Sequence, residues 1–332
     1  MKQVLPKLTS AIIYQMSAGF LGKIQALIKD EDGITNVTEA FESVESVDPG
    51  ATQWASAGIV KMPDGEWFID NDSSLSFIVQ INERKLPSKV RDELVQEKAA
   101  EIERQQGRRP HKKEFRLLIE EAEMALLPKA FIGRSQMLIT LTDADKLIIW
   151  TTSVKRGERG MGILLAWIEH LIPKAQPQFS NIGTAKEPAD VFTSIVKTNP
   201  GDNDTLCDGY SAVLKGESEV VRVRNMDLSS TDVQDLLRSD FKVVELQLIY
   251  DSKSLFGAND SAPDMTFTVN EGLIFKKIVV PGVANERGIE LLDAFNSNLF
   301  MITQTLLKAH AALLAELGTG NIATDVEDDD EF

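Results

Sequence analysis

Residues 126–150 read LLPKAFIGRSQMLITLTDADKLIIW, and the order of signals in this stretch decides the expected fold class. Pro128 ends the helix that precedes it, because a proline inside a helix removes a backbone hydrogen bond. Apolar runs at 137–141 and 147–151 flank the turn residues 143–145, which predicts a β-hairpin. Helices and strands that follow one another in blocks, without strict βαβ alternation, indicate an α+β protein.

Two helices are expected on the N-terminal side of this hairpin. Pro87 opens the first, and the second runs from about Lys112 to Leu126. Gly107 and Pro110 break the helical pattern between them, and the break carries the densest basic run in the chain, RRPHKK at 108–113. The lysine and arginine side chains of this run are therefore expected to project together from a tip.

Apolar periodicity places further elements along the chain. Short helices are expected at 20–28, 189–196 and 231–237, the first ended by an acidic turn at 30–33. The glycines of KRGERGMG at 155–162 predict a solvated turn before a helix that reaches Leu171, with a phosphate-binding loop as the alternative. Strands are expected near 11–16, 59–60, 67–68, 75–81, 211–214, 220–223, 243–250, 266–269 and 273–279.

The last helix, expected at about 285–317, has a regular apolar spacing over three heptads, at Leu292, Phe295, Leu299, Ile302, Leu306, Ala309 and Leu313. This spacing is typical of a helix–helix seam. A seam between two chains and packing within one chain both stay open, and we favour packing within the chain. After Gly318 and Gly320, the acidic residues 325–331 have no apolar face to bury, which predicts a disordered tail.

These elements divide the chain into four regions. Residues 1–83 and 135–280 are expected to form the mixed α+β centre and base, and residues 84–134 a helical basic tip. Residues 281–318 hold the long C-terminal helix, and residues 319–332 form the acidic tail.

Charge and cysteine content limit the class of protein. The chain has 332 residues, a net charge of −16 and one cysteine, Cys207, which argues against disulfides and cysteine-based metal sites. It has no apolar run of membrane-helix length and no secretory signal, so a cytoplasmic location is expected. Residues 84–134 hold 13 Lys/Arg against 9 Asp/Glu, so one basic surface is expected on an acidic body.

An enzymatic function is not expected. The histidines His111, His170 and His310 lie outside any nucleophile motif or H-E-x-x-H metal motif, and His170 is interpreted as a packed or partly exposed core residue. Paired carboxylates such as Glu120-Glu121 fit a helix surface better than an acid–base pair. No catalytic residue, metal or cofactor is therefore predicted.

The basic run is instead interpreted as a DNA-binding surface, with an ordinary solvated face as the alternative. Cations that gather at a Gly/Pro break neutralise phosphates and release counterions, which gives affinity without sequence readout. The candidate DNA-binding residues of this region are Arg108, Arg109, Lys112, Lys113, Arg116, Lys129 and Arg134.

Several motifs resemble the RdgC family of recombination-associated DNA-binding proteins. Residues 85–88 (KLPS) and 126–136 (LLPKAFIGRSQ) are similar to the family's L-P-S…L-L-P-[RK]-A-F-x-x-x-S-Q pattern. The order continues through LIIW at 147–150, DLSS at 227–230 and VELQL at 244–248. The chain lacks the family's usual W-F-K-N opening, as a divergent or phage-encoded member would.

The resemblance implies a horseshoe-shaped α+β protomer, two of which close into a homodimeric ring with a basic central channel for duplex DNA. It also implies nonspecific binding of single- and double-stranded DNA in the nucleoid, and inhibition of RecA-driven strand exchange. Phe131 matches the family's apolar gate residue at the dimer tip, and Arg108 matches a channel base. Arg224, with Arg222 on the same expected strand, matches a base deeper in the channel, although Asn225 and Met226 depart from the family there.

The tail supports a second interpretation. Its last residues, Asp328, Asp329, Asp330, Glu331 and Phe332, resemble the C-terminal tips of single-stranded-DNA-binding proteins, whose terminal Phe docks on partner proteins. Such a tail would compete with DNA for the basic channel or recruit replication and recombination proteins, and a solubilising tail is equally compatible. A metal-dependent nuclease is the third interpretation, for which the sequence offers no persuasive set of ligands.

Overall fold

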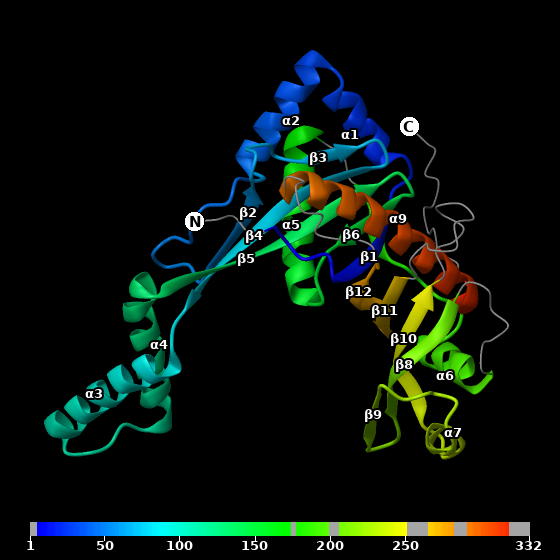
Figure 1. The fold of residues 1–332 in the computed structure, drawn as a ribbon. Helices are drawn as coiled ribbons and strands as arrows, with labels where there is room; N and C mark the ends of the chain where they lie inside the picture. Colours follow the sequence, from blue (N-terminus) through cyan, green and yellow to red (C-terminus); the bar gives the residue numbers. More distant parts are fainter. Residues whose placement is uncertain (1–4, 174–176, 199–205, 251–264, 282–290, 319–332) are drawn as a thin grey trace, which may run out of the picture.

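The computed structural model describes residues 5–173, 177–198, 206–250, 265–281 and 291–318. The α+β class is confirmed, because these residues form one twelve-stranded antiparallel sheet with helices packed against it. Figure 1 shows the sheet crossing the whole body, with one pair of helices standing apart from it.

The sheet is continuous from the first half of the chain to the second. Its strands lie in the order β2-β4-β5-β6-β1-β12-β11-β10-β8-β9, while β3 pairs with β4 and β7 with β1. The pairing of β1 with β12 therefore joins an N-terminal half to a C-terminal half. The strands are β1 Ser10–Met16, β2 Ala55–Val60, β3 Ile69–Asn71, β4 Ser74–Lys85, β5 Phe131–Thr142, β6 Lys146–Ile149, β7 Phe179–Asn181, β8 Leu206–Lys215, β9 Val220–Arg224, β10 Lys242–Tyr250, β11 Met265–Asn270 and β12 Ile274–Val279.

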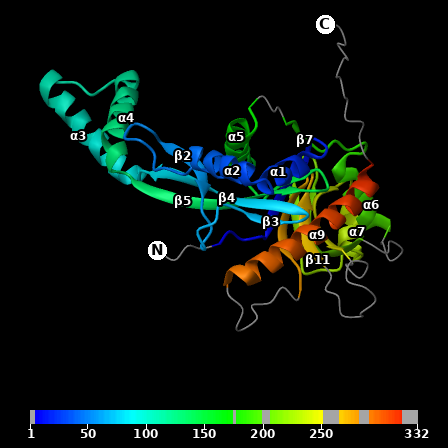
Figure 2. The same ribbon diagram turned by 90° about the horizontal axis from the view of Figure 1, so that it is seen from above.

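The helices bury the apolar side chains of the strands in two large cores, one on each face of the sheet. We call the face packed against α1, α2 and α5 the front, and the face packed against α6, α7 and α9 the back (Figure 2). The helices are α1 Phe20–Ile28, α2 Glu31–Ser43, α3 Ser88–Gln106, α4 Lys112–Leu126, the 3-10 turn η1 Leu127–Lys129, α5 Val154–Leu171, α6 Pro188–Thr198, α7 Thr231–Arg238 and α9 Leu291–Leu317.

Helix α1 ends at Ile28 as predicted, but the acidic residues 30–33 that follow it begin α2 instead of forming a turn. Asp30 is the N-cap of α2, and its carboxylate accepts a hydrogen bond from the backbone N–H of Gly33 at 3.0 Å. An aspartate that caps a helix and an aspartate in a turn look alike in sequence. The strand expected at 67–68 is also displaced, since β3 begins at Ile69.

The glycines of residues 155–162 lie inside α5, so both the solvated turn and the phosphate loop were wrong. Ser153 caps this helix, accepting a hydrogen bond from the backbone N–H of Arg156. Gly157 and Gly160 are buried on the side of α5 that faces the sheet. A Cβ on Gly160 would lie 2.9 Å from the Cε of Met137, so glycine permits the close approach of the helix to β5.

The apolar seam of α9 packs within the chain, as favoured. Leu299, Ile302, Leu306, Ala309 and Leu313 are all buried in the back core. The part of this helix expected at 285–290 and the acidic tail at 319–332 lie outside the described residues.

Candidate nucleic-acid interface

The tip, α3 and α4, is a helix pair carried away from the body on the outer ends of β4 and β5 (Figure 1). These two strands stay paired over twelve residues, from Ser74 opposite Thr142 to Lys85 opposite Phe131. We call their outer ends, residues 82–85 and 131–134, the arm. The length of this pairing places the tip beyond the helices that cover the body.

Two arginines at the end of the tip are paired with carboxylates. The guanidinium of Arg108 donates to both carboxylate oxygens of Glu114 at 2.8 Å, and Glu114 also accepts from the backbone N–H of His111. These hydrogen bonds lower the pKa of Glu114 to about 2, that from Arg108 contributing most. Arg109 lies 3.4 Å from Glu103, in a pair whose arginine side chain is 87% exposed. Phosphate would have to compete with Glu114 for Arg108.

The remaining tip cations are available to an anion. Lys112, Lys113 and Arg116 on α4 and Lys129 on η1 are all exposed. Among the described residues none of the four has a carboxylate within ion-pair distance. The structure therefore places these four side chains on the protruding helix pair and the turn that follows it, and their binding of DNA stays a prediction.

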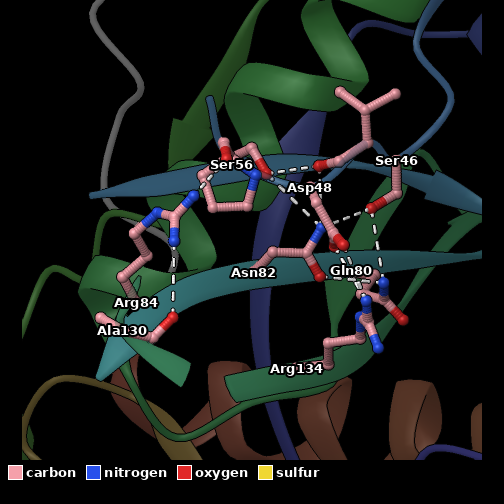
Figure 3. Close-up of polar contacts among 10 residues, drawn as sticks. Ser46, Asp48, Ser56, Gln80, Asn82, Arg84, Ala130 and Arg134 are labelled. Atoms are coloured by element: carbon pink, nitrogen blue, oxygen red, sulfur yellow. Dashed lines mark hydrogen bonds and ion pairs between the residues drawn. The ribbon is translucent and has the colours of Figure 1, made fainter. Parts of the chain in front are cut away.

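Arg134 lies at the root of the arm, and its charge is already balanced. Its guanidinium donates to both oxygens of Asp48, at 3.0 and 2.9 Å, and both side chains are about half exposed (Figure 3). Asp48 precedes β2 and is 86 residues away in the sequence. The structure thus separates Arg134 from the unpaired tip cations.

Phe131 begins β5 and is 82% exposed, the highest value among the large apolar side chains of the described residues. Opposite it on β4 lies Lys85, and the adjacent pair in the register is Arg84 with Ile132. An aromatic ring left in water at the end of a protruding arm is a surface that a second protein can cover.

The second basic surface lies on the front of the C-terminal half, which we call the open face. Arg222 and Arg224 alternate on β9 with the buried Val223, so both point to the same side. The register places Arg222 opposite Val213 and Arg224 opposite Ser211. A groove of about 300 Å³ lies there, lined by Ser211, Ala212, Val213, Arg222, Val223, Arg224, Val244, Glu245, Thr268, Asn270, Glu271 and Lys277.

The sequence analysis did not include two lysines of the open face. Lys277 lines the same groove as Arg222, and Lys276 on β12 donates to Glu245 on β10 at 2.7 Å, across the intervening strand β11. Consecutive residues of a regular strand point to opposite faces, so the pair Lys276-Lys277 did not reveal this surface in the sequence. In the structure the pairing of β11 with β12 is irregular at this point, and Lys277 has a φ of 51°. The open face holds acids as well, Glu245 and Glu271, so its charge is mixed.

The two basic surfaces lie at different ends of one protomer. Figure 1 shows the tip on one side of the body and β9, with Arg222 and Arg224, on the other. The predicted DNA-binding residues therefore form two groups, and one protomer does not bring them into contact.

Other chemistry is sparse in the described part of the chain. There, no three His, Cys, Asp or Glu side chains gather as metal ligands would. His111 precedes α4 as its N-cap, His170 is exposed on α5 rather than packed, and His310 is buried against Phe275. None of the helices that the structure describes is long and apolar enough to cross a membrane.

Together, the fold and its two surfaces define an α+β protein with an open antiparallel sheet and a basic helical tip. A family model described as "Putative exonuclease, RdgC" matches residues 27–319. The chain therefore belongs to the RdgC family.

Curated relatives share this family. The chain is 28% identical to the recombination-associated protein RdgC of Pseudomonas entomophila over 239 residues, which cover 71% of this chain and 74% of the relative. It is 27% identical to the protein of the same name from Pseudomonas aeruginosa and 25% identical to that from Pseudomonas putida, with the same coverage. The chain is thus recombination-associated by family.

Proposed function

We propose that this protein binds DNA without sequence preference and that two copies close around duplex DNA as a ring. From that position it modulates or inhibits strand exchange by a RecA-type recombinase in the nucleoid. The observation that carries the proposal is the group of exposed cations on the protruding tip, Lys112, Lys113 and Arg116. The name of the curated relatives, recombination-associated protein, supports the role in recombination.

The proposed binding mode is electrostatic. The tip cations, with Arg222 and Arg224 of the open face, would neutralise phosphates along one side of the duplex and release the counterions condensed there. An acidic body with basic surfaces restricts this attraction to those surfaces, since charges more than about 8 Å apart are screened at physiological salt. Neither surface presents a recognition helix, so sequence would not be read.

Phe131 is the proposed contact between the two copies at the tip. Its ring would bury on the order of 150–250 Å² of side-chain surface against a partner. A closed dimer needs a second contact between the two copies, away from Phe131.

A triple variant tests the role of the tip. Replacing Lys112, Lys113 and Arg116 by alanine should lower affinity for every duplex alike and reduce the slope of log K against log salt by up to about 3, at about 0.9 for each phosphate contact. The matched control replaces three exposed lysines of the body, Lys23 on α1, Lys29 at its C-terminal cap and Lys308 on α9, which removes the same charge. Equal losses in the two variants would contradict a tip-specific contact.

An exonuclease is the second candidate, because the family description names one. End-labelled duplex incubated with Mg²⁺ or Mn²⁺ should keep its length according to our proposal, with an EDTA sample as the reference. Metal-dependent shortening that purifies with the protein would favour the nuclease.

A further inference from the structure

Arg84 occupies an unusual position at the root of the arm. Its Nη1 donates to the backbone carbonyls of Leu127, Pro128 and Ala130, at 3.0, 3.3 and 3.4 Å. Its Nη2 donates to the carbonyls of Pro49 and Gly50, at 3.0 and 3.4 Å. Figure 3 shows this guanidinium, at the end of β4, between the loop before β2 and Ala130 just before β5.

These partners come from two segments far apart in the sequence. Residues 49–50 belong to the loop that joins α2 to β2, and residues 127–130 form the junction of the tip with β5. A guanidinium carries five donors in a rigid plane, so it holds several carbonyls in a fixed relative geometry. One side chain thus ties the body's loop to the base of the tip.

Asn82 fastens the same loop two residues earlier on β4. It is 1% exposed, and its Nδ2 donates to the hydroxyl of Ser46 at 3.0 Å and to the carbonyl of Val47 at 2.9 Å. Asn82 and Arg84 point to the same side of the strand, because alternate residues share a face. The ion pair of Arg134 with Asp48 adds a third, exposed link (Figure 3).

Besides these side chains, the backbone N–H of Arg84 donates to the carbonyl of Trp54 at 2.8 Å and Glu83 pairs with Arg159 of α5, so few contacts fix the direction of the arm and Arg84 makes the largest number of them. The tip's own core consists of three buried residues, Val95, Leu118 and Ala122. Beyond Glu83, whose partner on β2 is Ala55, the arm is a ribbon of two strands. Two-stranded ribbons twist more freely than broad sheets, so a small change at the root moves the tip by a large distance.

We propose that Arg84 is a positioning residue that sets the angle between the arm and the body. It holds Phe131 and the tip cations where a second copy of the chain meets them. The ring closure in this statement rests on the function proposed above, whereas the angle of the arm does not. Arg84 acts through the carbonyls it binds and makes no contact with DNA.

The first test measures the arm without DNA. Spin labels are placed on cysteines introduced at Gln106 in the tip and Glu169 on α5, both exposed, in a Cys207→Ser background. Arg84→Met, which keeps the aliphatic stem and removes all donors, should widen the distance distribution between the labels at least twofold. Arg84→Lys should widen it less, and Arg134→Ala, which breaks only the exposed pair, should widen it least.

The second test separates positioning from phosphate contact. The affinity of Arg84→Met for a short duplex should be within twofold of the parent's, with the same salt slope. After a salt chase, however, at least tenfold less of the variant than of the parent should remain on closed circular duplex. An unchanged distance distribution in Arg84→Met would overturn the proposal. So would a fall of the salt slope by about one, since that result makes Arg84 a phosphate contact. If the parent protein is not retained on circles while Arg84→Met still widens the distribution, the ring fails and the positioning role stands.

Discussion

The tip and the body of the protein are held together by different means. The tip has three buried apolar residues and surface ion pairs such as Arg91–Glu123 and Lys98–Glu121. The body buries two large cores on either side of one sheet, and Trp167 with Phe41 and Phe77 forms the centre of the front core. Exposed ion pairs contribute little to stability, whereas buried aromatic area contributes much. The unpaired cations of the tip can therefore serve binding without a large effect on stability, while the direction of the tip depends on the body.

The largest expected effect comes from the body's core. Trp167 is fully buried and stacks on Phe41 at 4.7 Å, so Trp167→Ala should cost about 3–5 kcal/mol of the free energy of unfolding. Leu118→Ala in the tip should cost about 2 kcal/mol, mostly as local opening of α3 and α4. Denaturant titration measures the loss in Trp167→Ala, and hydrogen exchange measures the local opening in Leu118→Ala. If Leu118→Ala lowered the global midpoint as much as Trp167→Ala, the two regions would not be distinct.

Acid should weaken the body before the tip. Burial lowers the pKa of His310 to about 4, with the charge of Lys146 adding to the effect, so the folded state keeps this imidazole neutral. The stability it protects is complete above its ordinary pKa of about 6.5 and decreases as the pH falls towards 4, by on the order of 3 kcal/mol. His310→Leu should flatten this part of the curve of stability against pH.

The carboxylate of Glu114 in the tip acts in the same direction as His310, but at lower pH. Because Arg108 and the backbone N–H of His111 hold the pKa of Glu114 at about 2, the contribution of this carboxylate is present above its ordinary pKa and is lost only as the pH falls through 2. Hydrogen exchange in α4 at pH 4 should therefore remain protected while the core around α9 loosens. Earlier loss of protection in α4 would contradict this order.

A double variant of the open face, Arg222→Ala with Arg224→Ala, compares the contribution of this face to duplex affinity with that of the tip. Glu245 and Glu271 line the same groove, and their negative charges repel phosphate. The two arginines should therefore contribute less to duplex affinity than the tip cations. We expect a threefold to tenfold loss of duplex affinity and a slope change of up to about 2. A loss greater than that of the tip triple variant would move the main DNA contact from the tip to the sheet.

The smallest expected effect is a gain. Glu114→Gln removes the charge that occupies Arg108 but keeps an acceptor for the N–H of His111, since glutamine also completes a capping box. Duplex affinity should rise about twofold and the salt slope should steepen slightly as Arg108 becomes available. Glu120→Gln, on the exposed side of α4, is the matched control and should change neither quantity.

Local signals predicted the tip well, and contacts between distant residues explain what they missed. α4 runs from Lys112 to Leu126 as predicted, because Pro110 and Pro128 bracket it. By contrast, α5 includes glycines that look like a loop until the sheet beneath them is known, as Gly160 against Met137 shows. Local pattern alone does not reveal a packing requirement of this kind.

The candidate site was likewise predictable only as a set of charges. Lys112 and Arg134 carried the same signal in the sequence, yet Arg134 is paired with Asp48, 86 residues away, and Lys112 is not paired within the described residues. Arg84 was counted among the basic residues of the region, while its role depends on five backbone carbonyls that no motif reveals. Charge is a property of sequence, and its availability is a property of the fold.

Retention on circular DNA tests the central proposal most directly. The protein is bound to closed circular duplex at low salt and challenged with high salt, before or after a restriction enzyme cuts the circle once. An encircling ring predicts that the protein stays on the intact circle and leaves once the DNA is linear. Equal and rapid loss from both forms would contradict encirclement and leave a protein that only touches the phosphates from one side.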